Sequence, residues 1–172
     1  MGSMLSARIR IMTVRRVGAL ALLSLLSMPA IAVDVIGIAD GDTLTVLLNG
    51  RPARIRLANI DAPEERQAFG SLARDSLAKL CHREAAVVNV VSTDRYGRAV
   101  ALVSCAGINV NRAQVERGLA WVDTRYNQDA AMPALQKVAM ARRRGLWSQA
   151  RPIPPWEFRR RPAVAAPGKS SW

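Results

Sequence analysis

The sequence predicts an α+β domain: a small five-stranded β-barrel of the OB type with three helices. Short β-branched segments of alternating polarity come early in the chain, and segments with apolar residues at helical spacing are interspersed later. The chain has 172 residues, of which 50% are hydrophobic, so it is long enough for one domain with appendages.

The first strands are predicted to form a hairpin. Residues 34–40 resemble a short strand, and residues 43–48, TLTVLL, are β-branched and alternating. The dipeptide Asn-Gly at 49–50 is typical of a two-residue hairpin turn. Residues 51–60 then return as the partner strand, with Pro52 near the turn, on an edge or in a bulge.

The later elements follow from the same periodicities. The predicted helices cover residues 67–81, 108–118 and 129–145. The predicted strands cover 85–93 and 99–105, joined by a turn at 94–98, with a short extended piece at 119–122.

The N-terminus has the pattern of a signal peptide. Arginines without acids precede an apolar run, and Ala30-Ile31-Ala32 supplies an A-x-A site, so cleavage is predicted after Ala32. An uncleaved anchor and a twin-arginine export signal are the alternatives. With residues 1–32 removed, the protein is expected to be secreted or periplasmic and to have no stable membrane association. It is also expected to be a monomer.

The net charge points to a polyanionic partner. The chain carries 25 Lys and Arg against 13 Asp and Glu, and removal of residues 1–32 with their four arginines would lower the net charge from +12 to +8. A positive net charge of this size favours binding to nucleic acid, although the charge could also serve only to keep the protein soluble.

Two cysteines remain in this exported chain, which favours a Cys81–Cys105 disulfide over two buried free thiols. Such a bridge would fasten the first helix to the barrel and would contribute roughly 3 kcal/mol.

The domain is assigned to residues 33–150, and the tail at 151–172 is rich in proline and arginine. This tail is predicted to be partly disordered, while Trp156 and Phe158 could dock on the domain.

The hairpin register brings carboxylates together. A two-residue turn places Thr43 opposite Arg56 and, counting further, Ile38 opposite Asp61. Asp42 and Asp61 therefore gather at the open end of the hairpin, with Arg56 nearby. Two neighbouring carboxylates repel, and a bound hard divalent ion would remove that repulsion.

These residues suit phosphodiester chemistry. The ion could offset phosphate charge, Glu64 could act on a water molecule, and Arg56 offers a fork for phosphate oxygens. In the turn DRYGR at 94–98, Tyr96 could stack on a base and Arg98 could reach a phosphate. Taken singly, each of these residues is also compatible with ordinary turn chemistry.

The segments ADGDTLTV, RIRLANIDAPE, DRYGR and NVNRAQVERGLAWV resemble, in order and spacing, the staphylococcal nuclease-like (thermonuclease) family. The resemblance covers about residues 34–147. It implies an OB-type barrel with three helices and a Ca²⁺-dependent phosphodiesterase that acts on DNA and RNA, severing the 5′ P–O bond.

The resemblance also implies roles for individual residues. Asp42 and Asp61 would bind Ca²⁺ through their side chains and Ala62 through its backbone carbonyl, with Asp40 near the ion. The catalytic set would be Arg56, Glu64 and Arg98. The substrate-binding set would be Arg95, Tyr96 and Tyr126, although Thr124 stands where a second tyrosine is expected.

Two other functions remain open at this point. A nuclease-like domain can serve as a non-catalytic nucleic-acid-binding module, and the basic tail would suit a structural protein of the cell envelope. Retention of Asp42, Arg56, Asp61, Glu64 and Arg98 favours the enzyme.

Overall fold

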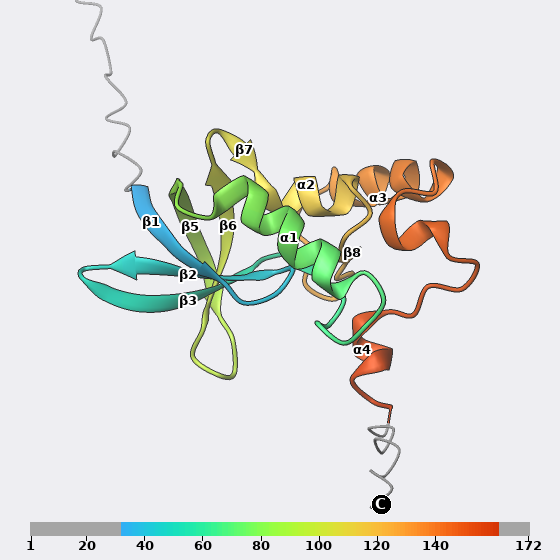
Figure 1. The fold of residues 1–172 in the computed structure, drawn as a ribbon, viewed down its shortest axis with the longest axis horizontal. Helices are drawn as coiled ribbons and strands as arrows, with labels where there is room; N and C mark the ends of the chain where they lie inside the picture. The colour runs from blue at the N-terminus through green and yellow to red at the C-terminus, as the bar shows by residue number, and fades with distance from the viewer. Residues whose placement is uncertain (1–31, 162–172) are drawn as a thin grey trace, which may run out of the picture.

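The computed structural model describes residues 32–161, and Figure 1 shows a strongly twisted sheet with helices packed along it. The strands are β1 (Ala32–Ile38), β2 (Thr43–Leu48), β3 (Arg51–Leu57), β4 (Ile60–Asp61), β5 (Ala85–Thr93), β6 (Ala99–Cys105), β7 (Ile108–Asn109) and β8 (Trp121–Val122). The helices are α1 (Gly70–Cys81), α2 (Val110–Glu116), α3 (Met132–Ala141) and α4 (Pro155–Phe158), with a 3₁₀ helix η1 (Gly145–Ser148).

The sheet closes into the predicted five-stranded barrel. Its strands are ordered β3-β2-β1-β5-β6-β7, and an additional parallel pairing between β3 and β6 joins the two sides. In this pairing Ile55 lies opposite Ala99 and Arg56 opposite Val100. The closure places the start of β6, and the turn that precedes it, beside the end of β3.

The β2–β3 hairpin has the predicted register. Asn49 and Gly50 both have positive φ, as a type I′ turn requires, and Thr43 pairs with Arg56. Pro52 is accommodated without a shift in this register.

Beyond this hairpin the predicted register was wrong. Ile38 pairs with Leu44 on β2, whereas Asp61 pairs with Trp121 on β8. The reason is that β3 ends at Leu57 and the chain turns before β4, with Asn59 at a positive φ. Asp61 therefore belongs to a separate two-stranded sheet.

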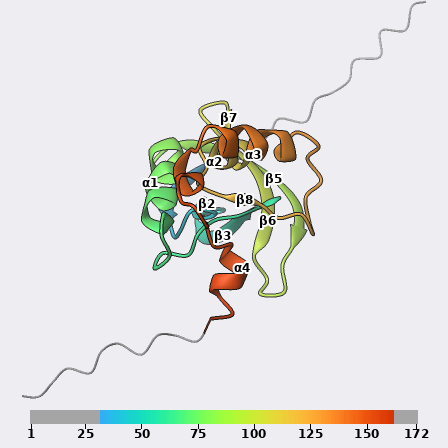
Figure 2. The ribbon, with the colours of Figure 1, turned by 90° about the vertical axis from the view of Figure 1, so that its right-hand side faces the viewer.

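The three predicted helices are present, although all three are shorter than expected. Figure 1 shows α1 lying across the strands, while α2 and α3 lie together at one end of the barrel. The described tail adds α4, which projects below the barrel in Figure 2. Residues 1–31, which hold most of the expected signal peptide, and residues 162–172 lie outside the described part. No helix in residues 32–161 is long and apolar enough to span a membrane.

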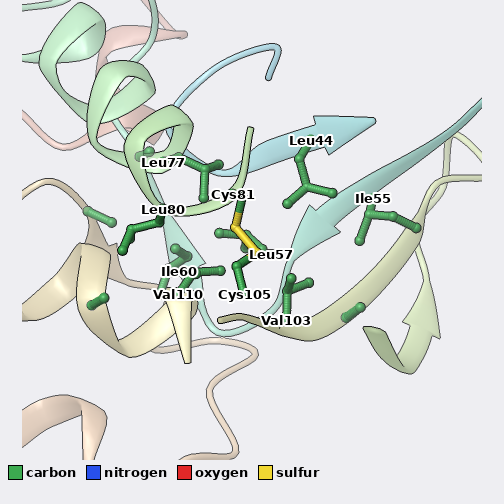
Figure 3. Packing of buried hydrophobic residues seen from close by; sticks show 14 of the residues in the cluster. Leu44, Ile55, Leu57, Ile60, Leu77, Leu80, Cys81, Val103, Cys105 and Val110 are labelled. Atoms are coloured by element: carbon green, nitrogen blue, oxygen red, sulfur yellow. A yellow bond between two sulfur atoms is a disulfide. The ribbon is translucent and has the colours of Figure 1, made fainter. Parts of the chain in front are cut away.

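The barrel core and α1 share one apolar cluster with the disulfide inside it (Figure 3). Leu44, Leu57 and Leu77 are almost completely buried, and each such side chain contributes on the order of 2 kcal/mol. Cys81 at the end of α1 and Cys105 at the end of β6 form the predicted disulfide, with a Cα–Cα distance of 5.3 Å. The bridge therefore fixes α1 to the barrel.

Two buried amides of α2 hold neighbouring elements in place. Asn111 accepts a hydrogen bond from the N–H of Val103 and donates to the carbonyls of Ala58 and Ala101. Gln114 donates to the carbonyl of Gly41 at 2.7 Å and to a carbonyl of α1. In this way α2 fixes the loops at the end of the barrel where the charged residues gather.

Candidate active site

The turn between β1 and β2 carries Asp42 into the protein. Gly41 makes this possible, because a Cβ there would lie 2.5 Å from the Cβ of Ala73 and 2.8 Å from that of Ala62. The Asp42 carbonyl accepts a hydrogen bond of 2.8 Å from the N–H of Leu57, which ties the turn to β3. The Asp42 side chain therefore has a fixed position and is only 3% exposed.

Asp42 and Asp61 share one guanidinium group. Arg56 donates from Nη1 to Asp42 Oδ1 at 2.9 Å and from Nη2 to Asp61 Oδ1 at 3.0 Å. Asp61 is 1% exposed. The structure thus brings together the two aspartates and the arginine that the sequence predicted to be neighbours, and it shows that Arg56 bridges them directly.

Burial dominates the electrostatics of this pair. It raises the pKa of Asp42 from 3.8 to about 7, while the charge of Arg56 acts in the opposite direction and Asp40 adds to the rise. Burial alone would lower the pKa of Arg56, but the two aspartates raise it overall. A further cation at the carboxylates would stabilise the ionised form of Asp42.

The oxygen donors fit a hard divalent ion in their chemistry. Within residues 32–161 there is no group of three or more His, Cys, Asp or Glu side chains arranged to hold a metal. A site here would therefore depend on the carboxylates of Asp42 and Asp61, supplemented by the Ala62 carbonyl. Asp40 lies close by and accepts a hydrogen bond from the Asp42 N–H. Carboxylate and carbonyl oxygens are the donors that Ca²⁺ prefers.

Glu64 lies on the loop that connects β4 to α1. This loop folds back so tightly that a Cβ on Gly70 would collide with the carbonyl of Glu64. The Glu64 N–H donates to Gln67 Oε1 at 3.2 Å, and the Gln67 N–H donates to the Glu64 carbonyl at 2.8 Å. The Glu64 carboxylate is left 39% exposed at the same end of the barrel as Asp61.

Arg159 is a member of this cluster that the sequence did not predict. It donates from Nη2 to Asp61 Oδ2 at 2.7 Å and from Nη1 to Glu64 Oε1 at 2.6 Å. The sequence predicted that Trp156 could dock on the domain, and in the structure its ring centroid lies 5.6 Å from that of Trp121 in an edge-to-face contact. This contact holds the segment that carries Arg159 close to the carboxylates. In the sequence, the predicted docking of Trp156 was the only feature that could have indicated the position of Arg159.

A broad cleft extends from these carboxylates over the barrel. Its volume is about 1320 Å³. Its lining includes most of the predicted site residues together with Arg159: Asp40, Asp42, Arg56, Ala62, Glu64, Arg95, Tyr96, Arg98 and Tyr126. The predicted catalytic and substrate-binding residues therefore share one cavity with the predicted ion-binding residues except Asp61, which is almost completely buried behind it.

Arg98 lines the cleft but does not touch the two aspartates. Its Nε donates to Asp94 Oδ2 at 2.7 Å, and the same carboxylate accepts from the Arg98 N–H. This pairing holds the turn before β6, and the β3–β6 closure sets that turn beside Arg56. Asp94 had been expected only as a turn residue, and it fixes the orientation of Arg98.

Two exposed tyrosines line the cleft. Tyr96 is 74% exposed and Tyr126 is 69% exposed. The guanidinium of Arg95 lies 5.5 Å from the Tyr96 ring, and that of Arg125 lies 5.4 Å from the Tyr126 ring. Exposed rings beside cations can stack on nucleobases while the cations meet phosphates. Arg125 had not been singled out in the sequence.

Comparison with known proteins agrees with this arrangement. Residues 54–149 match the family described as "Staphylococcal nuclease homologue". The chain is 41% identical to an "Uncharacterized endonuclease" of Escherichia coli, over 81% of this chain and 94% of that protein. It is 40% identical to the "Micrococcal nuclease" of Shigella flexneri, over 84% of this chain and 91% of that protein. It is also 40% identical to "Probable staphylococcal-like nuclease CAN1" of Oryza sativa, over 62% of this chain and 32% of that protein.

Proposed function

Because this chain belongs to the staphylococcal nuclease family, we propose that it is a Ca²⁺-dependent nuclease that hydrolyses phosphodiester bonds in DNA and RNA. We further propose that it acts outside the cytoplasm, as a secreted or periplasmic protein, after cleavage near Ala32. The observation that carries the proposal is the pair of buried aspartates, Asp42 and Asp61, joined by Arg56. Asp42 and Arg56 line a cleft that also holds other basic side chains and exposed tyrosines.

In this proposal Asp42, Asp61 and the Ala62 carbonyl hold the ion. Bound there, Ca²⁺ would supply positive charge that polarises a phosphoryl oxygen and offsets the charge of the diester. Arg56 and the backbone already hold the two carboxylates next to each other, so Asp42 and Asp61 themselves would need to move little.

Glu64 is the proposed general base. Its exposed carboxylate can accept a proton from a water molecule, which then attacks the phosphorus atom. The P–O bond to the 5′ oxygen breaks, the leaving oxygen takes up a proton from solvent, and a 3′-phosphate remains. Glu64 must be free of Arg159 for this step.

The basic and aromatic residues would bind the substrate. Arg56 and Arg98 are proposed to hold phosphate oxygens and to stabilise the extra negative charge of the five-coordinate transition state. Tyr96, Tyr126 and Arg95 are proposed to contact the nucleotides along the cleft. Recognition of backbone charge and ring stacking is compatible with both DNA and RNA.

A metal panel tests the proposal. Plasmid DNA and a synthetic RNA should be cut with Ca²⁺, and cutting should stop when EGTA is added. The test also separates the enzyme from a non-catalytic binding module, which would shift the same nucleic acid in a gel but leave it intact in every metal. Intact substrate with Ca²⁺, Mg²⁺ and Mn²⁺ would refute the proposed activity.

A further inference from the structure

The side chain of Arg159 occupies the oxygens that an ion would need. Its two terminal nitrogens contact both oxygens of Asp61, at 3.2 and 2.7 Å. The nitrogen nearer to Glu64 also donates to that carboxylate. One guanidinium group therefore engages both the buried carboxylate proposed as an ion ligand and the carboxylate proposed as the base.

The contact is held by a folded segment. Trp156 packs on Trp121, the side chain of Gln67 donates to the carbonyl of Ile153, and Pro155 is buried. The short helix α4 continues into Arg159, whose N–H donates to the Pro155 carbonyl at 2.9 Å. The segment thus positions its arginine across 98 residues of sequence from Asp61.

This arrangement is incompatible with a bound ion on two counts. A divalent ion could not reach the Asp61 oxygens from the side that the guanidinium covers, and two cations at one carboxylate repel each other. Arg159 also occupies Oε1 of Glu64, so a water molecule cannot take the place of the guanidinium at that oxygen while the contact is made.

We propose that the C-terminal segment is an autoinhibitory strap in which Arg159 competes with the divalent ion for Asp61 and Glu64. This inference rests on the proposed ion site and goes beyond it, because it makes the apparent ion affinity depend on the position of the tail. Ion binding releases Arg159, and the same step frees Glu64.

The direct test is a calorimetric titration of the mature chain with Ca²⁺, comparing Arg159→Gln with the wild type. If the strap covers the site for about nine-tenths of the time, its removal should tighten the apparent Kd about tenfold. Arg160→Gln is the matched control. It removes the same charge from the next position, and within residues 32–161 the Arg160 side chain makes no hydrogen bond or ion pair.

A truncation that ends at Phe158 gives a second variant. It removes Arg159 but retains Trp156 and its contact with Trp121. This variant should bind Ca²⁺ as tightly as Arg159→Gln. In the wild type, Ca²⁺ should also change the tryptophan emission and speed tryptic cleavage at residues 159–161, because the segment would leave its place.

The outcomes separate the two proposals. Equal Ca²⁺ affinity in the wild type, both variants and the control would overturn the strap and leave the ion site intact. Weaker binding in Arg159→Gln and in the truncation would also overturn it, because Arg159 would then support the site. No Ca²⁺ binding in any of these proteins would overturn the ion site and the strap together.

Discussion

Asp42 Oδ2 accepts a hydrogen bond of 2.8 Å from the backbone N–H of Ala62, which lies 20 positions further along the chain. This bond sets the turn before β2 against the residue that follows β4. It means that Asp42 has a structural role besides its proposed role as an ion ligand. The two roles can be separated, because the first needs an acceptor oxygen and the second needs a negative charge.

Asp42→Asn and Asp42→Ala should therefore differ. Asparagine retains an oxygen that can accept from the Ala62 N–H, so Asp42→Asn should stay folded while losing Ca²⁺ binding and cutting. Alanine leaves that buried N–H and Nη1 of Arg56 without their acceptor, so Asp42→Ala should lower the free energy of unfolding by about 1–3 kcal/mol. Denaturant melts in EGTA, followed by Ca²⁺ titrations, measure both effects. Wild-type Ca²⁺ affinity in Asp42→Asn would refute the role of Asp42 as a ligand.

Glu64→Gln should lose turnover and keep the fold. The amide preserves the size of the side chain but cannot accept a proton at neutral pH, and removing a general base commonly lowers kcat by about 10²–10⁴. The measurement is kcat on an oligonucleotide at saturating Ca²⁺, with the melting curve as a control for folding. Glu65→Gln, one position along the same loop, is the matched comparison and should cut normally. A nearly normal rate in Glu64→Gln would remove Glu64 from the mechanism.

Tyr96→Ala should weaken binding of single-stranded nucleic acid. The ring is exposed in the cleft, and loss of a base stack typically costs about 1–3 kcal/mol, so Kd should rise about tenfold. Binding is measured with a labelled oligonucleotide in EGTA, which should prevent cleavage. Tyr96→Phe keeps the ring and should bind as the wild type does. If both variants bind normally, the Tyr96 ring makes no important contact with the substrate.

Local signals were sufficient for most of the barrel. The bounds of β2, β5 and β6 were predicted to the residue, because each strand is β-branched and is bounded by turn residues. The Asn-Gly turn fixed the pairing of Thr43 with Arg56, which correctly placed Asp42 beside Arg56. Asp61 was correctly predicted to lie near them, although the register predicted for it, opposite Ile38, was wrong. The cysteine pair followed from the count of two in a chain that was predicted to be exported.

What the sequence did not reveal depends on contacts between distant segments. The parallel β3–β6 pairing has no local pattern, and neither does the contact of Arg159 with Asp61. An arginine in a proline-rich tail is normally solvated, so only the folded position of α4 shows that this one faces carboxylates. Asn111 and Gln114 were missed for a similar reason, because polar residues on a helix are usually exposed.

Loss of the Cys81–Cys105 disulfide should lower thermal stability. The bridge closes a loop with a sequence separation of 24, for which chain entropy gives about 3 kcal/mol, or a fall in Tm on the order of 10 °C. The double variant Cys81→Ala with Cys105→Ala avoids the need to reduce a buried bond. Calorimetric scans of both proteins in EGTA measure the difference. The double variant should still cut nucleic acid at temperatures well below its Tm, since neither cysteine lines the cleft. Equal melting temperatures would show that packing alone holds α1 on the barrel.

Asn111→Leu should be among the most destabilising single changes in α2. Leucine has a similar size, so it leaves the volume filled, but it removes three hydrogen bonds of 2.9 to 3.0 Å. The N–H of Val103 and the carbonyls of Ala58 and Ala101 would lose these bonds in a fully buried place. The Ala101 carbonyl keeps its hydrogen bond from the Ala58 N–H, so two buried groups are left unpaired, and at about 1–3 kcal/mol for each the loss should be at least about 2 kcal/mol. Asn111→Asp tests the same point differently, because a carboxylate can accept a hydrogen bond from the N–H of Val103 but cannot donate to the two carbonyls.

Urea melts should therefore find both Asn111 variants much less stable than Arg112→Gln. This control at the next position removes an exposed ion pair with Asp129. If Asn111→Leu unfolds at the wild-type urea concentration, the amide does not fix α2 to the barrel.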